Sequence, residues 1–402
     1  MLFVVIVATA SCMLVLAARR VRASRTWRAT VTPLASIIGS GFLVLAPLLA
    51  ETVGAWAAPA MLGIVLAAYA IGSALRFNIV HTEPLLASSD APEVARDLER
   101  ISRIALGFAY TISVAFYLRL LASFVLDGVG LQSQFNDRVL TTGILATIAT
   151  VGVVRGLHGL ETLEIPAVDV KLAVIAGLLA AMAVFDVVHG SATVTAYRHH
   201  PITLDGLTVV RRLAGMLLVV QGFETSRYLG HYYGPALRAR TMRHAQIISG
   251  AIYVMFAALV VAFFNDLGAG PRETSILDAA RVVSPVLVPM LVVAAVASQL
   301  SAATADTAGG AEMLTDRPRH QRLNIGYPVV ALGAVLVVWL VDVFSIVSLA
   351  SRAFALYYLF QVILAAMAAR RLGIPRYRLA VAANLVLAAA LVFVVVAAIP
   401  SG

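Results

Sequence analysis

IIGSGFL, residues 37–43, places two glycines and a serine in the middle of an apolar segment long enough to cross a membrane. That segment runs over residues 31–53 and also contains Pro33 and Pro47. Glycine and proline weaken a helix, and backbone amides and carbonyls without partners are costly in hydrocarbon. Such a break is tolerated where the freed backbone groups line a cavity. The stretch therefore predicts a discontinuous helix beside a polar site.

The composition is that of an integral membrane protein. Of 402 residues, 61% are hydrophobic and 13% charged, far from the balance of a soluble domain. The single Cys12 excludes an intramolecular disulfide, and the eight histidines show no pair at metal-ligand spacing. We therefore expect no metal and no organic cofactor. We also expect no enzyme, since no Ser/His or paired-carboxylate arrangement has catalytic spacing, and no nucleic-acid partner, since the arginines lie in short loops.

Apolar segments recur along the chain at the length that a transmembrane helix needs, about 20 residues. There are twelve, near residues 1–18, 31–53, 56–79, 104–126, 139–156, 166–188, 207–230, 244–265, 282–306, 325–342, 344–368 and 379–399. Arginines gather in every second connection, beginning with residues 19–30, which the positive-inside rule assigns to the cytoplasm. The sequence thus predicts an all-α, multi-pass protein of the inner membrane, with its N-terminus outside.

A second interrupted segment lies at residues 219–230, VVQGFETSRYLG. When the first apolar segment is set aside as accessory, the two interrupted ones are the first and the sixth. An offset of five helices inverts the second unit, which is the pattern of two inverted five-helix repeats. The predicted division is an accessory helix at 1–18, repeats at 31–188 and 207–368, and a C-terminal helix at 379–399.

The two breaks predict a solute site between them. Half-helix N-termini favour a carboxylate and C-terminal carbonyls favour a cation, which suits a small polar or zwitterionic solute. In the alternative interpretation the glycines only allow helices to pack closely. The candidate substrate-binding residues are Ser36, Ile38, Gly39, Ser40 and Gly41 at the first break, Gln221, Gly222, Phe223 and Glu224 at the second, and Tyr110, Tyr117 and Arg119 between them in sequence.

Several stretches carry a family resemblance. ASIIGSGFLVLAPLLAETVGAWA (35–57) resembles the first helix of the amino acid–polyamine–organocation (APC) transporters, and QGFETS (221–226) is similar to their sixth. VVRGLHGLETLEIPAVDVKLAVIAGL (153–178) resembles their fourth-to-fifth connection, where a lysine recurs in helix five. The resemblance implies the LeuT-type fold and secondary transport of amino acids or related amines. The extra first helix, and ASQLSAATADTAGG (297–310), are instead similar to the sodium–solute symporters, which share this fold.

Lys171 is the only lysine among thirty basic residues. A buried lysine can release its proton, whereas arginine cannot. In some proton-coupled APC transporters a lysine at the matching position replaces the inner sodium, and the resemblance implies this role for Lys171. Asp306 lies at a similar depth beside Thr304 and Thr307, so we expect it to pair with Lys171 across the helices. In one alternative Lys171 extends to the lipid headgroups and Asp306 faces cytoplasmic water. In another the threonines serve a sodium ion.

Glu224 and Arg119 are further charges expected within the membrane. Glu224 is a candidate for protonation or for a substrate amine, and Arg119 for a substrate carboxylate; equally, Glu224 could pair structurally with Arg119 or Arg352. The sequence thus predicts a secondary active transporter that moves a small amino acid-like or amine solute by alternating access, with protons favoured over sodium. The alternatives are a sodium-coupled symporter of the same fold and a solute sensor without net transport. The expected partners are the solute and the lipid bilayer.

Overall fold

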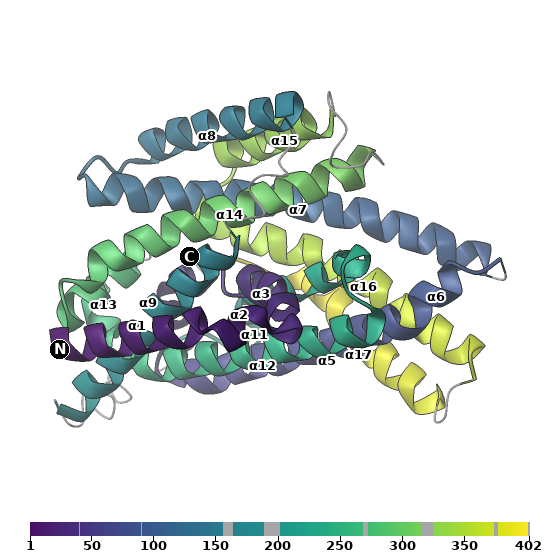
Figure 1. The fold of residues 1–402 in the computed structure, drawn as a ribbon, viewed down its shortest axis with the longest axis horizontal. Coiled ribbons are helices and arrows are strands. Elements are labelled where there is room, and N and C mark those ends of the chain that lie inside the picture. Colours follow the sequence, from purple (N-terminus) through teal and green to yellow (C-terminus); the bar gives the residue numbers. More distant parts are fainter. Residues whose placement is uncertain are drawn as a thin grey trace.

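The computed structural model describes residues 1–39, 41–89, 91–155, 164–188, 202–267, 272–315, 325–373 and 377–400. Within these ranges the regular elements are all helical, and many of the long helices run side by side in a bundle (Figure 1). Eight helical segments of the described chain are long and apolar enough to cross a membrane. The predicted all-α, multi-pass architecture is therefore confirmed.

The helices have the following bounds. The first half contains α1 (Leu2–Ala17), α2 (Arg19–Ala23), α3 (Arg25–Ile37), α4 (Gly41–Val53), η1 (Gly54–Trp56), α5 (Ala57–Phe77), η2 (Asn78–Thr82), α6 (Glu83–Leu86), α7 (Glu93–Gly128), α8 (Gln134–Arg155) and α9 (Glu164–Val188). The second half contains α11 (Gly206–Gly215), η4 (Leu217–Val220), η5 (Phe223–His231), α12 (Pro235–Val260), η6 (Val261–Asp266), α13 (Ser275–Val283), α14 (Leu287–Thr315), α15 (Gly326–Leu340), α16 (Val343–Arg371) and α17 (Tyr377–Ala397).

Helices lie in all twelve predicted segments, but several are not separate full-length spans. One helical run from Gly41 to Leu86 joins α4 to α5 through the 3-10 turn η1. The helices α1 and α15 are apolar but shorter than the other spans. The segment 207–230 divides into α11, η4 and η5. The predicted boundaries of the two repeats stay a prediction.

Side-chain caps set where the helices around the breaks begin. An oxygen at the N-cap accepts a hydrogen bond from a backbone amide of the first turn that has no partner within the helix. Ser24 does this for α3 (from Trp27, 3.3 Å), Asp205 for α11 (from Thr208, 2.9 Å) and Asp342 for α16 (from Ser345, 2.9 Å). These three helices thus start at residues that the local sequence specifies.

The helix α7 lies at the centre of the bundle. It packs against α14, α16, α8 and α15, and α8 and α15 form a separate layer above it and α14 in Figure 1. Most residues of α7 from Leu106 to Phe124 are buried. Polar side chains on this part of α7 must therefore find partners inside the protein.

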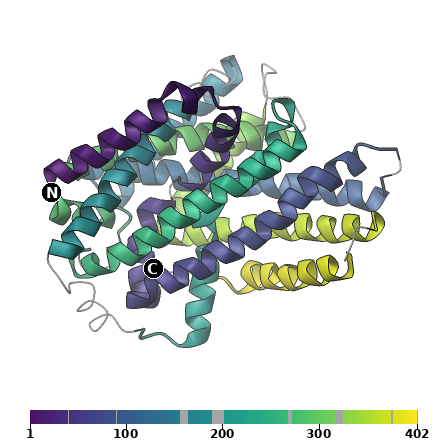
Figure 2. The ribbon, with the colours of Figure 1, turned by 60° about the horizontal axis from the view of Figure 1, so that its bottom comes forward.

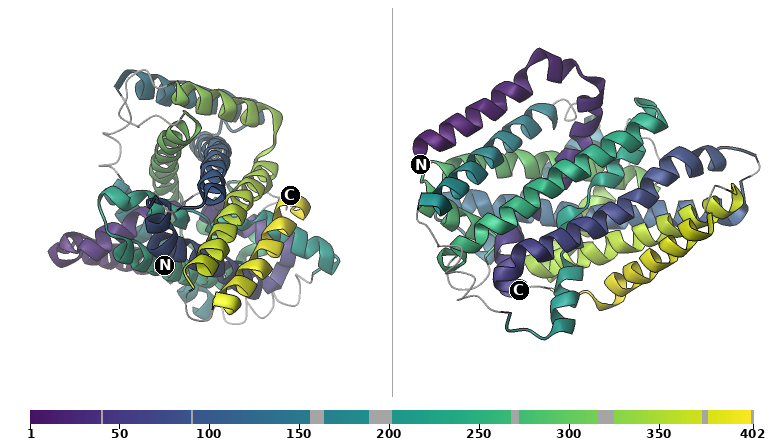
Figure 3. Two further views of the ribbon diagram at one scale, coloured as in Figure 1. Left: turned by 90° about the vertical axis from the view of Figure 1, so that its right-hand side faces the viewer. Right: turned by 90° about the horizontal axis from the view of Figure 1, so that it is seen from below.

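The helices α1 and α17 lie at opposite edges of the bundle (Figures 2 and 3). The accessory helix α1 packs along α9, and α17 packs along α16. Of residues 377–397 only Leu391 is buried, so α17 presents an apolar surface outward. Both helices thus cover the core from the side that faces lipid in a membrane.

Candidate functional site

The two interrupted helices meet at their breaks. The first helix stops at Ile37 and resumes at Gly41, and the second is interrupted between η4 and η5 at Gln221 and Gly222. Gly222 has a φ of +116°, a conformation that residues with a side chain rarely adopt. A Cβ at Gly222 would lie 2.6 Å from the carbonyl carbon of Ser36. Only glycine permits the second break to approach the first this closely.

Gly41 makes the reciprocal contact. A Cβ at Gly41 would lie 2.6 Å from the Cα of Val219 and 2.8 Å from its carbonyl oxygen. The start of α4 therefore rests on the backbone of η4 rather than on a side chain. The glycines therefore allow close packing, as the alternative interpretation has it, and they also mark the predicted breaks. Both are true because the two breaks pack against each other.

Side chains from two other helices bind backbone groups of the interrupted helices. The hydroxyl of Tyr253 in α12 donates to the carbonyl of Ile37 at 2.7 Å. In the second interrupted helix, the hydroxyl of Ser351 in α16 donates to the carbonyl of Gly215 at 2.7 Å and accepts from the amide of Leu218 at 2.8 Å. These bonds replace helical ones, which explains how the breaks are stable within a membrane.

Lys171 binds the first break from α9. Its ammonium donates to the carbonyl of Ala35 at 2.9 Å and to the hydroxyl of Ser298 in α14 at 3.0 Å. The residue is only 6% exposed. The alternative in which Lys171 extends to the lipid headgroups therefore does not hold. One charged group instead joins the broken helix to two helices that are distant in sequence.

A cavity of about 310 Å³ adjoins this junction. That volume lies at the small end of the range for ligand pockets. Among the predicted site residues, its walls include Ser36, Tyr110, Lys171, Thr304 and Asp306. The structure thus brings candidates from the first break, from α7, from α9 and from α14 into one space. A direct pair between Lys171 and Asp306 stays a prediction.

Two buried acceptors lie at the second break. The fully buried carboxyl of Glu224 accepts through Oε2 from the Tyr358 hydroxyl at 2.7 Å and from the Gly222 amide at 2.9 Å. Gln221 donates from Nε2 to the Tyr117 hydroxyl at 3.0 Å. Among the residues that the structure describes, neither Glu224 Oε1 nor Gln221 Oε1 has a hydrogen-bond partner. A donor supplied from outside would satisfy them, since an unpaired buried acceptor is costly.

Comparisons with known proteins show the family of this chain. A sequence profile described as an APC superfamily transporter matches residues 19–398. The chain belongs to the APC superfamily of transporters. This transporter is 44% identical over 346 residues to an uncharacterized protein of Aquifex aeolicus (strain VF5), a match that covers 85% of this chain and 84% of that protein.

Among solved structures, the transporter is similar to a Na⁺-coupled sialic acid symporter in a substrate-bound, outward-open state. The TM-score is 0.57 at 17% identity, and the likeness covers 97% of this chain and 96% of that one. At this identity the likeness shows the fold alone. It confirms the LeuT-type fold that the family resemblance implied.

The structure does not bring every candidate of the transporter to the breaks. Arg119 donates to the carbonyl of Gln134 at 3.0 Å and lies 3.9 Å from the carboxyl of Asp137, both in α8. Two residues along a helix rotate a side chain by about 200°, so Arg119 faces away from Tyr117. Arg352 donates to the carbonyl of Ala398 at 3.1 Å. Neither arginine is the partner of Glu224, whose carboxyl is bound by Tyr358 instead.

The remaining candidates are placed as follows. Phe223 is fully buried and stacks on the ring of Tyr358, with ring centroids 5.2 Å apart. The hydroxyl of Thr307 donates within α14, to the carbonyl of Ala303 at 2.6 Å, and that of Thr304 also donates within α14. Ile38 and Gly39 form the link that follows α3. Ser40 lies outside the described residues.

Three residues at or next to these contacts had no role in the sequence analysis. Ser298 accepts a hydrogen bond from Lys171, and Tyr358 donates one to Glu224. Gln299 is fully buried, and neither of its amide atoms has a hydrogen-bond partner in the described part of the chain. Ser298 and Gln299 belong to the ASQLS stretch, so their polarity within an apolar span is a signal that could have identified them.

Replacing Gly41 by alanine tests the contact between the breaks. A methyl group there collides with the backbone of Val219, which cannot rotate away, so we expect Gly41→Ala to lower the free energy of unfolding by about 1–3 kcal/mol. Gly63→Ala is the matched control, since its Cβ meets no atom within 4 Å and alanine favours a helix over glycine by about 1 kcal/mol. Thermal unfolding in detergent measures both. Equal melting temperatures for the two variants would contradict the contact.

Proposed function

We propose that this APC superfamily transporter carries a small amino acid-like or amine solute by alternating access, and that Lys171 couples the movement to protons. We further propose that it resides in the inner membrane with its N-terminus outside. The orientation rests on the arginines, which gather in the connections on the side where Arg28 and Arg238 lie. The cavity beside Lys171 includes Arg28 in its wall, so it reaches toward that predicted cytoplasmic side.

The observation that carries the proton proposal is the position of the Lys171 ammonium. A carbonyl of an interrupted helix and a hydroxyl of a facing helix are the oxygen ligands that a sodium ion takes in transporters of this kind. In this chain the ammonium of Lys171 donates to two oxygens of these kinds, the carbonyl of Ala35 and the hydroxyl of Ser298. A protonated Lys171 thus supplies the positive charge that a sodium ion would otherwise supply.

Proton release changes what holds α3 in place. The neutral amine loses its charge and one of its donors, so its bonds to Ala35 and Ser298 weaken. The half-helix α3 is then tied less firmly to α9 and α14. Alternating access requires that such half-helices move relative to the rest of the bundle. Protonation of Lys171 therefore biases one conformation, and deprotonation releases it.

The solute class follows from the acceptors at the second break. Glu224 Oε1 and Gln221 Oε1 lie buried and available at the unwound backbone. A primary or secondary amine brings the N–H donors that these oxygens lack, and its positive charge suits the carboxyl of Glu224. Tyr110, which lines the cavity, lies on the same helix face as Tyr117, the partner of Gln221. The amine thus has a path of polar groups between the cavity and the break.

Lys171→Arg tests the coupling most sharply, because arginine keeps the charge and the donors but cannot release a proton. In proteoliposomes screened with amino acids and amines, we expect the wild type to accumulate solute when a pH gradient is imposed. Lys171→Arg and Lys171→Ala should lose this accumulation, with thermal unfolding showing that both variants are folded. Ser301→Ala is the control, since Ser301 lines the same cavity on α14, one turn from Ser298.

Two results would contradict this proposal. Accumulation that is driven by a sodium gradient and survives Lys171→Ala would place the protein with the sodium-coupled symporters. Solute binding that is intact in detergent, without accumulation under any ion gradient, would make it a sensor.

Glu224→Gln tests the amine site. The substitution keeps the shape but removes the carboxylate, so we expect the affinity for an amine solute to fall at least tenfold, as expected for the loss of one charge-assisted hydrogen bond. Tyr358→Phe leaves the carboxyl and removes only its hydroxyl partner, and should change the affinity less. Isothermal titration of the purified variants measures both. An unchanged affinity in Glu224→Gln would exclude Glu224 from the amine site.

A further inference from the structure

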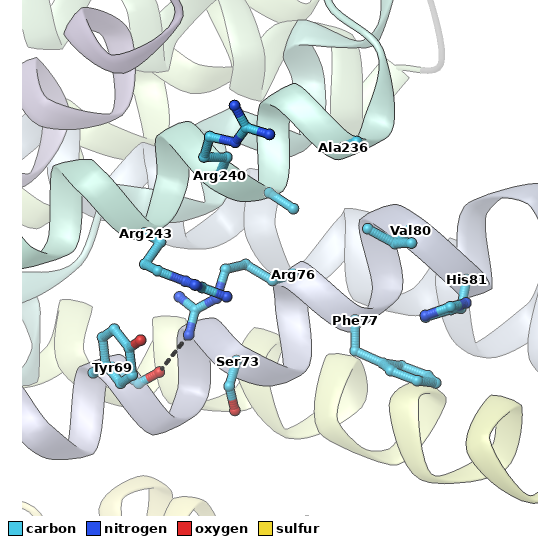
Figure 4. A pocket seen from close by; sticks show the side chains of 10 residues that line it. Tyr69, Ser73, Arg76, Phe77, Val80, His81, Ala236, Arg240 and Arg243 are labelled. Atoms are coloured by element: carbon cyan, nitrogen blue, oxygen red, sulfur yellow. Dashed lines mark hydrogen bonds between the residues drawn. The ribbon is translucent and has the colours of Figure 1, made fainter. Parts of the chain in front are cut away.

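A second pocket lies on the outer face of the bundle, between α5 and α12 (Figure 4). It has a volume of about 570 Å³ and does not share residues with the cavity beside Lys171. Three arginines line it, Arg76 from α5 and Arg240 and Arg243 from α12. The other lining residues are apolar, aromatic or neutral, apart from His81, and none carries a carboxyl group.

Within the described residues, no acidic side chain compensates the charge of this pocket. Arg76 is only 8% exposed, and its described partners are the side-chain amide of Gln246 and the carbonyl and ring of Tyr69. In the described part of the chain, no ion pair joins Arg76, Arg240 or Arg243 to an acidic residue. Figure 4 shows the guanidinium groups of Arg76 and Arg243 next to one another. Like charges this close favour an anion between them.

Nearby arginines show that the fold does pair such charges elsewhere. Arg227 lies 3.2 Å from the carboxyl of Glu83 and 3.1 Å from that of Glu99, and Arg238 lies 2.7 Å from Glu83. Arg238 is in the same helix as Arg240 and Arg243. Within the described part of α12, the arginines without an ion pair, Arg240 and Arg243, are therefore those that line the pocket.

The guanidinium of Arg76 is held in position. Its partner Gln246 donates from Nε2 to the carbonyl of Ala68 at 2.8 Å. The Gln246 amide lies against Gly72, where a Cβ would come within 2.6 Å of the amide carbon. The centre of the Tyr69 ring lies 4.6 Å from the guanidinium carbon. Arg76 is thus a fixed cationic group, and its side chain loses little conformational entropy when an anion binds.

An exposed apolar surface continues from the pocket toward the middle of the membrane. On α5, Leu62 and Leu66 are 46% and 59% exposed and precede Tyr69 and Ser73 at helical spacing. On α12, Ile247 follows Arg243 by one turn and is 54% exposed. The end of α5 and the start of α12 lie on the predicted cytoplasmic side. The surface thus combines a cationic end at headgroup depth with an apolar end in the hydrocarbon.

We propose that this pocket binds the phosphate of an anionic phospholipid from the cytoplasmic leaflet. The three arginines contact the phosphate, and the acyl chains lie on Leu62, Leu66 and Ile247. Arginine donates two parallel hydrogen bonds to phosphate oxygens, so a fixed Arg76 gives the site specificity as well as charge. The apolar surface favours a lipid over a free phosphate, because an inorganic anion leaves that surface unused.

The test uses the purified full-length protein and phosphatidylglycerol as the probe, with binding measured by native mass spectrometry. Basic residues near an anionic headgroup contribute about 1 kcal/mol each, so we expect Arg240→Gln/Arg243→Gln to weaken binding about thirtyfold. Arg76 stays in place in this variant, because its bonds also join α5 to α12. The matched control is Arg20→Gln/Arg25→Gln, which removes the same charge from two exposed arginines on the same predicted side.

We expect the control variant to bind phosphatidylglycerol as tightly as the wild type does. Phosphatidylcholine, which lacks a net charge, should bind equally to the wild type and to Arg240→Gln/Arg243→Gln. Equal loss in the two double variants would overturn the proposal, because binding would then follow total charge. A site that inorganic phosphate alone fills, with no preference for phosphatidylglycerol, would overturn the assignment to a lipid.

Discussion

The structure depends on one constraint, which is that backbone groups freed by a broken helix cannot remain unpaired inside a membrane. Both breaks meet it with side chains from elsewhere in the fold. Tyr253 binds the carbonyl of Ile37, Lys171 binds that of Ala35, and Ser351 bridges Gly215 and Leu218. Each of these bonds joins an interrupted helix to a continuous one. The breaks are therefore not defects in two spans but the points at which the bundle is held together.

The same bonds make the junction sensitive to charge. Lys171 can gain or lose a proton, and it contacts α3 and α14 at once. Glu224 holds the second break through the amide of Gly222 and has an oxygen that lacks a described partner. Lys171 at the first break and Glu224 at the second thus each bind backbone groups next to the contact between the two breaks. In our proposal this arrangement links solute binding to proton binding, because both events change what holds the half-helices.

The features that local sequence specifies were predictable, and the contacts between distant helices were not. Glycines and prolines within an apolar span revealed the breaks, and a single lysine among arginines revealed Lys171. The family implied the fold. Ser298 and Tyr358 lie more than a hundred positions from Lys171 and Glu224, respectively. They could not be assigned as the partners of these two residues before the helices were placed. Arg119 shows that prediction is limited even within one helix. Its depth in the membrane was predictable, but the sequence did not show that it lies on the face toward Asp137.

The most direct test of this account observes the Lys171 ammonium itself. Because the chain has one lysine, labelling lysine Nζ with nitrogen-15 gives a single side-chain signal in a magnetic resonance spectrum. The account predicts a signal protected from hydrogen exchange, reduced protection in Ser298→Ala, and a titration midpoint that moves when solute is added. A rapidly exchanging signal that changes neither with the substitution nor with the solute would contradict the claim that Lys171 takes the place of a coupling cation. A signal that loses its protection when sodium is added would contradict it as well.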